Sequence, residues 1–258
     1  AGQAVEGATV MGYGAFKGTA STTDNANGTL AIGYQAGTAI TTAAGITLVG
    51  YGAGDAITTA VNNNAFGYNA LGANTSGVSN VAMGKDAMAA NTTASDGTAV
   101  GHNSLAANTT GAQNTAFGSS TLDANTTGAN NTAIGQGALG ANTTASNNTA
   151  VGLSALILNT TGASNVAVGT TALDANTTAS NNTAVGHNAL GANTTGTPND
   201  AFGFQALLAN TTGASNVGIG AYCLDANTTA SGNTALGYGS LSTTITGAQN
   251  TAVGYLAL

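Results

Sequence analysis

The chain repeats itself with a period of 17 residues over almost its whole length of 258 residues. A glycine that ends the pentapeptide Asn-Thr-Ala-Val-Gly marks the period, and it is found at Gly33, Gly50, Gly67, Gly84, Gly101, Gly118, Gly135, Gly152, Gly169, Gly186, Gly203, Gly220, Gly237 and Gly254. Gly12 precedes this series by 21 residues, which predicts a four-residue insertion near residues 21–28. An unbroken period of this length is typical of a solenoid, in which each repeat forms one coil and packs on its neighbours.

The residue types within the repeat indicate strands and turns. The consensus unit reads Asn-Thr-Ala-Val-Gly-x-x-Ala-Leu-x-Ala-Asn-Thr-Thr-Gly/Ala-x-Asn, with positions numbered 1 to 17. Gly, Thr, Asn and β-branched residues dominate, and no apolar stripe with the helical spacing of about 3.6 residues is present. The sequence therefore predicts an all-β protein. We expect one parallel β-solenoid domain (a β-roll or β-helix) over residues 1–258, with one repeat per coil and about 15 coils.

Two short apolar pairs in each repeat predict which side chains fill the core. We place one strand at positions 2–4 and a second strand around the Ala-Leu pair at positions 8 and 9. Neighbouring residues on a strand face opposite ways, so we expect the larger member of each pair to fill the core. The alanines would then form a flat outer face that favours packing against an identical chain, in a homotrimer or another bundle. A monomer whose alanines face water is the alternative.

The repeat also resembles known families. Asn-Thr-Ala-Val-Gly-x-x-Ala-Leu resembles the Ser-Val-Ala-Ile-Gly-type repeats in the heads of trimeric autotransporter adhesins. It is similar too to the repeat arrays of bacterial and phage tail-fibre-like proteins, as residues 64–71 and 233–241 illustrate. The resemblance covers essentially the whole chain. It implies a left-handed β-roll, a trimer, and a location outside the cell, on the cell surface or on a virion, but it specifies no ligand.

The ends of the chain give a further expectation about assembly. Ala1 falls at position 11 of the repeat and Leu258 at position 9, and neither end has a polar cap. Bare coil ends expose strand edges that pair with another chain. We therefore expect head-to-tail stacking into a filament, with adjacent coils about 4.8 Å apart. A fragment cut from a longer fibre is the alternative.

Charge excludes two classes of partner. Only 4% of the residues are charged, the net charge is −7, and the only basic residues are Lys17 and Lys85. Nucleic acids and anionic membrane surfaces both bind basic patches, so we predict neither as a partner. No apolar run approaches the length of about 18 residues that a membrane-spanning helix needs, so we predict no membrane insertion.

No combination of residues predicts catalysis, a metal site or a cofactor. His102 and His187 share one repeat position but lie five coils apart, roughly 24 Å, which is too far to share a metal ion. Asp123, Asp174 and Asp225 follow one another at three coils, about 14 Å, too far for an acid–base pair or a shared calcium ion. Motifs for nucleotide, zinc or serine-hydrolase sites are absent. We therefore predict that the chain is not an enzyme and has no cofactor.

A recurring Asn-Thr-Thr motif leaves two interpretations open. Its asparagines are Asn91, Asn108, Asn125, Asn142, Asn159, Asn176, Asn193, Asn210 and Asn227. Each matches the acceptor pattern for N-glycosylation. The same residues would also form an asparagine ladder at a corner of the coil, where side chains bond from one coil to the next.

Tyrosines follow the marker glycine in the first repeats and form a candidate surface row. They are Tyr13, Tyr34, Tyr51 and Tyr68. Tyrosine rings stack on sugars, which would suit binding to a cell-surface glycan or receptor. The rings could equally stabilise the coils by contacting one another, and both interpretations stay open.

These observations favour a non-enzymatic, extracellular structural or adhesive fibre element: a filament subunit, a tail-fibre shaft or an adhesin head. The alternative is an ice-binding β-solenoid, which low charge and regularly spaced threonines would suit. The position-2 threonines include Thr132, Thr149, Thr183, Thr234 and Thr251, and Val166, Asp200 and Val217 interrupt them. We expect the chain itself to be its main partner.

Overall fold

The computed structural model describes residues 7–17, 27–243 and 245–258. In this part of the chain there are fifteen short strands and no helix. The chain divides into two compact units, unit 1 (Ala1–Asn130) with β1–β7 and unit 2 (Asn131–Leu258) with β8–β15. Of the predicted insertion, residues 21–26 lie outside the described residues.

Each strand occupies positions 2–4 of its repeat, with one extra residue in β12 and β13. Unit 1 contains β1 (Thr9–Met11), β2 (Leu30–Ile32), β3 (Thr47–Val49), β4 (Asn64–Phe66), β5 (Val81–Met83), β6 (Thr98–Val100) and β7 (Thr115–Phe117). Unit 2 contains β8 (Thr132–Ile134), β9 (Thr149–Val151), β10 (Val166–Val168), β11 (Thr183–Val185), β12 (Asn199–Phe202), β13 (Asn216–Ile219), β14 (Thr234–Leu236) and β15 (Thr251–Val253).

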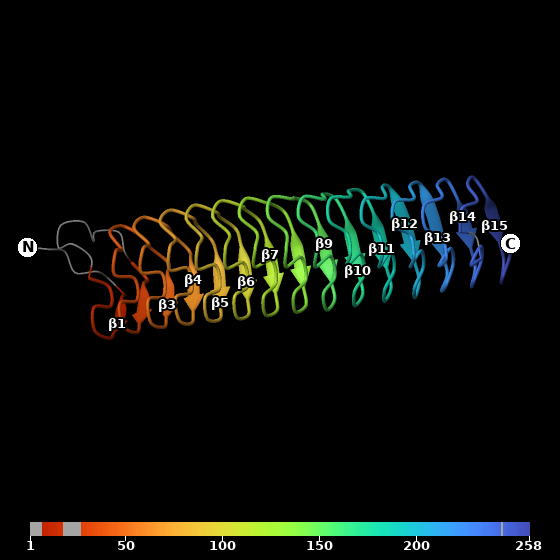
Figure 1. Cartoon of the computed structure of the whole chain (residues 1–258). Coiled ribbons are helices and arrows are strands. Elements are labelled where there is room, and N and C mark those ends of the chain that lie inside the picture. Colours follow the sequence, from red (N-terminus) through yellow and green to blue (C-terminus); the bar gives the residue numbers. More distant parts are fainter. Residues whose placement is uncertain (1–6, 18–26, 244) are drawn as a thin grey trace, which may run out of the picture. The chain divides into compact units, whose positions relative to one another are not determined.

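Within each unit, consecutive strands pair in parallel and in sequence order (Figure 1). Equivalent residues of successive repeats lie opposite each other, as Ala99 does with Ala116 and Ala167 with Ala184. Only the pairing of β1 with β2 has a step other than 17 residues, because Val10 pairs with Ala31. The same 21-residue step separates the first two marker glycines. The predicted parallel β-solenoid with one repeat per coil is confirmed.

In the strands other than β1 and β3 the small residue at position 3 faces the core and the large one at position 4 faces outward, which is the reverse of the sequence prediction. Ala167 at position 3 is fully buried, whereas its neighbour Val168 at position 4 is half-exposed. Gly218 shows why, because a Cβ atom added there would lie 3.0 Å from Cys223 Sγ and 3.4 Å from Leu207 Cδ1. Side chains from positions 8 and 9 already fill the space behind the strand, so only a methyl group fits.

One coil shows that positions 3 and 9 share a single volume. Leu48 replaces alanine at position 3 and is fully buried. The position-9 residues around it are Gly37 and Gly54 instead of leucine, and a Cβ atom on either would lie 2.8 Å or 2.7 Å from a Leu48 methyl carbon. A close-packed interior admits a large side chain only where its neighbour is small. Leucine at one position therefore requires a smaller residue at the other.

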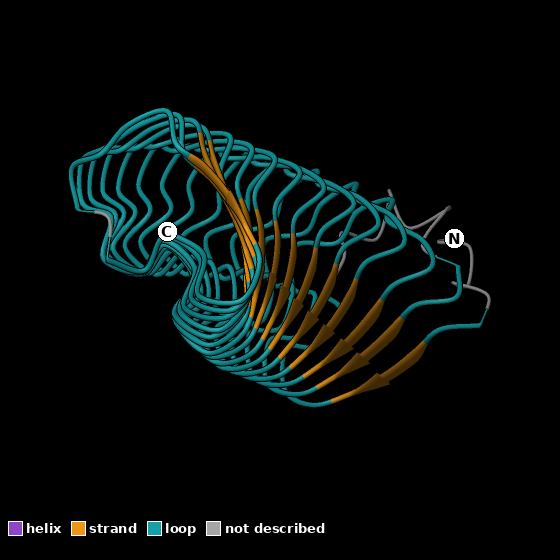
Figure 2. Cartoon of the chain, turned by 90° about the vertical axis from the view of Figure 1, so that its right-hand side faces the viewer, coloured by secondary structure: helices purple, strands orange, loops and turns teal. Residues whose placement is uncertain are grey.

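The predicted second strand around Ala-Leu is wrong, because positions 8 and 9 lie in a turn. Figure 2 shows strands on one side of the coil and loops elsewhere. The position-9 leucines have a left-handed backbone, with φ of 52° at both Leu105 and Leu173. This conformation costs a non-glycine residue about 1–2 kcal/mol. Full burial of a leucine side chain contributes about 1.5–3 kcal/mol, which offsets the strain and keeps leucine in the turn.

The marker glycine ends each strand in a conformation that only glycine adopts easily. Its φ lies between 126° and 142° in all fifteen coils. Successive coils also approach each other closely here, so a Cβ atom on Gly101 would overlap the carbonyl oxygen of Gly118 in the next coil. The positive φ and the close backbone contact are two separate reasons for glycine at this position.

A pair of glycine substitutions tests the close contact. We expect Gly101→Ala to lower the free energy of unfolding by about 3–5 kcal/mol, because backbone strain and overlap add together. Gly52→Ala is the control, since Gly52 also has a positive φ of 61° but its nearest neighbour would lie 3.9 Å away. That variant should lose about 1–2 kcal/mol. Urea unfolding followed by circular dichroism measures both, and equal losses would contradict the proposed contact.

Candidate functional site

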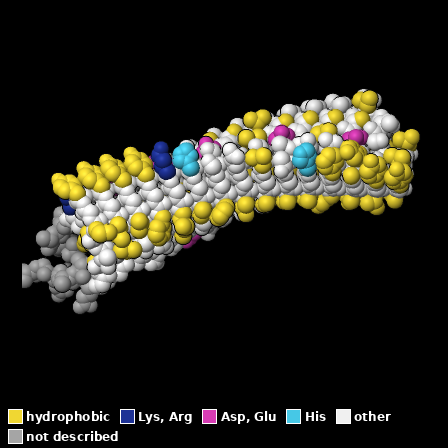
Figure 3. Space-filling view, turned by 90° about the horizontal axis from the view of Figure 1, so that it is seen from below, with side chains coloured by type: hydrophobic (Ala, Val, Ile, Leu, Met, Phe, Trp, Pro, Cys, Tyr) yellow, Lys and Arg dark blue, Asp and Glu magenta, His cyan; other side chains and the backbone are white. Residues whose placement is uncertain are grey.

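Equivalent positions form rows along the surface of each unit, because the coils are in register. Figure 3 shows rows of hydrophobic side chains, with few charged groups between them. The described part of the chain has no pocket, no cluster of three potential metal ligands, and no helix suited to crossing a bilayer. The surface rows are the features from which a functional site can be built.

The first row, called the apolar row here, consists of the large side chains at position 4. Its members are Met11, Ile32, Val49, Phe66, Met83, Val100 and Phe117 in unit 1, and Ile134, Val151, Val168, Val185, Phe202, Ile219, Leu236 and Val253 in unit 2. All are exposed or half-exposed, and Phe117 reaches 56% exposure. Among the described strand residues only Asp200 is charged. The apolar row therefore lies on an almost uncharged sheet face.

The area of the apolar row matches that of the largest apolar patch on a typical monomer. A large apolar side chain presents on the order of 150–200 Å² when fully exposed, so the unit-2 part leaves roughly 500 Å² in water. The largest apolar patch of a typical monomer is about 300–600 Å², and such patches often mark interaction sites. The apolar row is thus a candidate interaction surface.

The second row is aromatic, and in unit 1 its rings stack on one another. Neighbouring ring centroids of Tyr13, Tyr34, Tyr51 and Tyr68 lie 5.6, 4.9 and 5.1 Å apart, with interplanar angles of 19°, 12° and 11°. Lys17 Nζ lies 5.3 Å from the Tyr13 ring centroid. A sugar would need a free ring face, but the inner faces are covered by neighbouring rings. The geometry therefore matches ladder contacts between coils better than sugar stacking.

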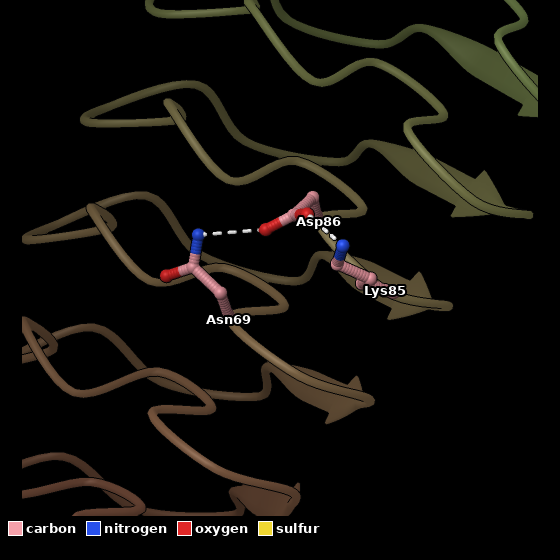
Figure 4. A network of polar contacts seen from close by, with 3 residues as sticks. All are labelled: Asn69, Lys85 and Asp86. Atoms are coloured by element: carbon pink, nitrogen blue, oxygen red, sulfur yellow. Dashed lines mark hydrogen bonds and ion pairs between the residues drawn. The ribbon is translucent and has the colours of Figure 1, made fainter.

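A small polar network adjoins the other end of this tyrosine row (Figure 4). Lys85 Nζ lies 5.9 Å from the Tyr68 ring centroid and 3.7 Å from Asp86 Oδ2. Asn69 Nδ2 donates a hydrogen bond of 3.0 Å to Asp86 Oδ1 from the preceding coil. Lys85 is mostly exposed, so this ion pair contributes little to stability. The Lys85 ammonium group lies between Asp86 and Tyr68, the last tyrosine of the unit-1 row.

Unit 2 has a similar aromatic row with one irregular member. His187 stacks on Phe204 at 5.4 Å and Tyr238 stacks on Tyr255 at 5.4 Å. Tyr222 stands between these pairs at 69° to Phe204 and 72° to Tyr238. It comes from position 7 rather than position 6, which is why the sequence pattern did not include it in the row.

The asparagines of the Asn-Thr-Thr motif lie inside the coil. All nine are fully buried. Asn176 Nδ2 donates hydrogen bonds to Asn159 Oδ1 in the preceding coil, 2.9 Å, and to the Ala179 carbonyl oxygen, 3.0 Å. Asn165 at position 1 donates to the same carbonyl oxygen at 2.8 Å. Because Nδ2 is buried and donating, a glycan has no access to it in the folded coil, and the geometry matches the corner ladder.

Position 1 carries a second buried asparagine ladder that the sequence analysis did not identify. Asn148 Oδ1 accepts the backbone N–H of Asn165 at 2.9 Å, linking successive coils. The signal in the sequence was the recurrence of Asn at both positions 1 and 12. The coil of residues 46–62 has isoleucines at both positions, Ile46 and Ile57, and both are buried. Position 1 alone changes in the coil of residues 97–113, where Gly97 accompanies the buried Asn108 and a Cβ atom on Gly97 would lie 2.7 Å from Met88 Cε. Other side chains can therefore fill this part of the core.

Threonines at positions 13 and 14 form the third row. Position-13 hydroxyls donate to the next coil, as Thr160 Oγ1 does to the Thr177 carbonyl oxygen at 3.0 Å. The position-14 side chains, called the threonine row here, are exposed throughout: Thr42, Thr59, Ser76, Thr93, Thr110 and Thr127 in unit 1, and Thr144, Thr161, Thr178, Thr195, Thr212, Thr229 and Thr246 in unit 2. This row is unbroken, unlike the position-2 threonines from which the sequence analysis argued.

The ionisable groups are dispersed. Partial burial raises the pKa of Asp55, Asp123, Asp174 and Asp225 above the ordinary value of 3.8. Burial also raises the pKa of the Cys223 thiol to about 12, so the thiol is protonated and unreactive at neutral pH. His102 and His187 are exposed and belong to different units. The structure brings none of these groups together into a catalytic arrangement within either unit.

The asparagine network predicts a large difference between two alanine substitutions. Asn176→Ala removes the two hydrogen bonds that Asn176 Nδ2 donates and the one that its Oδ1 accepts from Asn193 Nδ2. The buried amide groups of Asn159 and Asn193 lose this partner, so we expect a loss of about 2–4 kcal/mol in the free energy of unfolding. Thr178→Ala, two residues away and exposed, should change it by less than about 0.5 kcal/mol. Urea unfolding gives both values. Comparable losses would show that the amide network is not what stabilises the corner.

The raised pKa of Asp174 predicts a pH dependence. The folded chain binds the proton more tightly than the unfolded chain, so stability falls as pH rises through the folded-state pKa and recovers on acidification. We expect Asp174→Asn to melt at a higher temperature than the wild type at neutral pH. The difference should disappear well below the unfolded pKa of 3.8, where Asp174 is protonated in both the folded and the unfolded chain. A constant difference across this range in thermal melts would contradict the effect of burial.

Comparison with known proteins assigns no function to these rows. Scans against the models of protein families, against curated proteins and against solved structures found no match to the chain.

Proposed function

We propose that this chain is a non-enzymatic structural or adhesive fibre element that acts outside the cell, on a cell surface or on a virion, as a filament subunit, a tail-fibre shaft or an adhesin head. In this proposal it assembles with copies of itself, as a homotrimer or a filament. The observation that carries the proposal is the apolar row, which is unbroken within each unit and lies on an almost uncharged sheet face. Apolar surface of this extent favours burial against a partner.

A second copy of the chain suits this surface better than an unrelated globular partner. Both copies have the same coil spacing of about 4.8 Å, so side chains of two rows can interdigitate coil by coil without losing register. A stable interface buries about 800 Å² on each partner. The apolar row with the flanking position-2 residues approaches that area. The contact surface is therefore the position-4 row, and not the alanine face expected from the sequence, because the alanines are buried.

Substitution of two phenylalanines tests the assembly. Full burial of a phenylalanine contributes about 1.5–3 kcal/mol, and Phe117 and Phe202 are 56% and 41% exposed, so about half of this is gained from each on association. Phe117→Ser combined with Phe202→Ser should therefore weaken self-association about ten- to a hundredfold. Both side chains are exposed in the single chain, so thermal stability at high dilution should change little. Sedimentation velocity across a concentration series measures the association.

The matched control replaces two exposed threonines of the threonine row, Thr110→Ser and Thr212→Ser. This control should associate like the wild type. If the wild type stays monomeric at high concentration, or if the phenylalanine variant associates unchanged, self-assembly through the apolar row is wrong.

Ice binding is a second candidate, and the threonine row is the observation that favours it. An unbroken row of exposed hydroxyl and methyl groups, repeated about every 4.8 Å, is a regular surface on which water can order. Thermal hysteresis and ice-recrystallisation assays measure the activity directly. Thr178→Lys with Thr195→Lys should abolish it, whereas Thr170→Lys, outside the row, should not. Clear wild-type activity with this dependence would overturn the fibre proposal, and no activity would remove ice binding.

A further inference from the structure

We propose that the stacked tyrosines of unit 1 are a site of oxidative cross-linking, at which a haem peroxidase with hydrogen peroxide joins neighbouring coils through dityrosine. The rings of Tyr34 and Tyr51 lie 4.9 Å apart at 12°, and those of Tyr51 and Tyr68 lie 5.1 Å apart at 11°. These three side chains are 41%, 51% and 51% exposed. The row therefore combines access for an external oxidant with contact between the rings that must react.

The chemistry needs two adjacent phenols and one two-electron oxidant. Each phenol gives up one electron and one proton to become a phenoxyl radical. Two radicals on neighbouring rings form one carbon–carbon bond between their ortho carbons, and the hydrogen on each of those carbons then moves to the phenol oxygen. Hydrogen peroxide accepts the two electrons and two protons and leaves as two molecules of water. The only bond lost from each ring is one C–H bond.

Other oxidisable groups compete weakly for the radicals within this chain. The sequence contains no tryptophan, and the single thiol of Cys223 is buried with a pKa raised to about 12. Tyr222 is a phenol without a stacked partner, because it meets both neighbours at steep angles. Stacking therefore distinguishes the tyrosines that should couple from one that should not.

A cross-link of this kind would hold two coils together covalently. Tyr34 and Tyr51 are 17 residues apart in the sequence and directly adjacent in the stack. Closing a loop in the unfolded chain lowers its conformational entropy, as a disulfide does, and this raises the stability of the folded state. The chain has one cysteine and so forms no internal disulfide. The tyrosine row would supply the covalent bond between coils instead.

The test is oxidation of an equal mixture of unlabelled and isotope-labelled full-length chains at low concentration, with peroxidase and hydrogen peroxide. Dityrosine fluorescence measures the yield, and mass spectrometry of the digested product identifies the joined peptides. We expect peptides joining Tyr34 to Tyr51 and Tyr51 to Tyr68, each from a single isotopic form. The melting temperature of the oxidised chain should also rise.

Two conservative variants keep the result interpretable. Tyr51→Phe removes the central phenol and keeps the ring, so both expected cross-linked peptides should disappear and the dityrosine yield should fall. The stacked pairs Tyr13–Tyr34 and Tyr238–Tyr255 remain and would supply the residual yield. Tyr222→Phe is the matched control and should give the wild-type yield. Mixed-isotope links, links to Tyr222 at similar yield, or an unchanged yield in Tyr51→Phe would each overturn the proposal.

Discussion

The parallel, in-register hydrogen bonding between successive coils is the interaction on which the rest of this structure depends. Each strand pairs with its equivalent one repeat away, and the loops bond in the same register, as Leu105 N does to the Thr121 carbonyl oxygen at 3.0 Å. The spacing leaves no room for a Cβ atom at the marker glycine. Every other feature, whether the buried asparagine ladders or the exposed rows, exists because each coil places equivalent side chains directly beside those of its neighbour.

The interior of the coil is narrow, and this explains its unusual composition. Alanine at position 3 and leucine at position 9 fill the apolar part, while the asparagines at positions 1 and 12 fill the rest and bond to the position-15 carbonyl. Buried amides are tolerated only when their hydrogen bonds are made. The coil with Ile46 and Ile57 shows that apolar side chains at both positions also fit. The asparagine pair and the isoleucine pair therefore fill the same part of the coil's cross-section.

The large apolar side chains at position 4 lie on the surface of the coil. A narrow core cannot hold both the position-9 leucine and the position-4 residue, so the latter remains on the surface in every coil. A solenoid of this type presents long rows in place of a cleft, and rows suit partners that are themselves periodic. A second copy of the same chain is such a partner, and an ordered water layer is another. The stacked tyrosines have the same origin, because one tyrosine in each of several successive coils gives a continuous column of rings.

The sequence by itself determined the period, the parallel pairing, the glycine at the end of each strand and the burial of the position-9 leucine. These follow from backbone hydrogen bonding and from a repeat that every coil obeys, so a pattern of single residues is sufficient to predict them. Only the tertiary structure decided that Ala167 lies inside and Val168 outside, that Asn176 is buried, and that the faces of Tyr34 are covered. The direction of a side chain depends on the volume left by other segments of the coil. That volume is determined only once all segments of the coil have packed together. The alternation of residues along one strand is equally consistent with either face of the strand being inside.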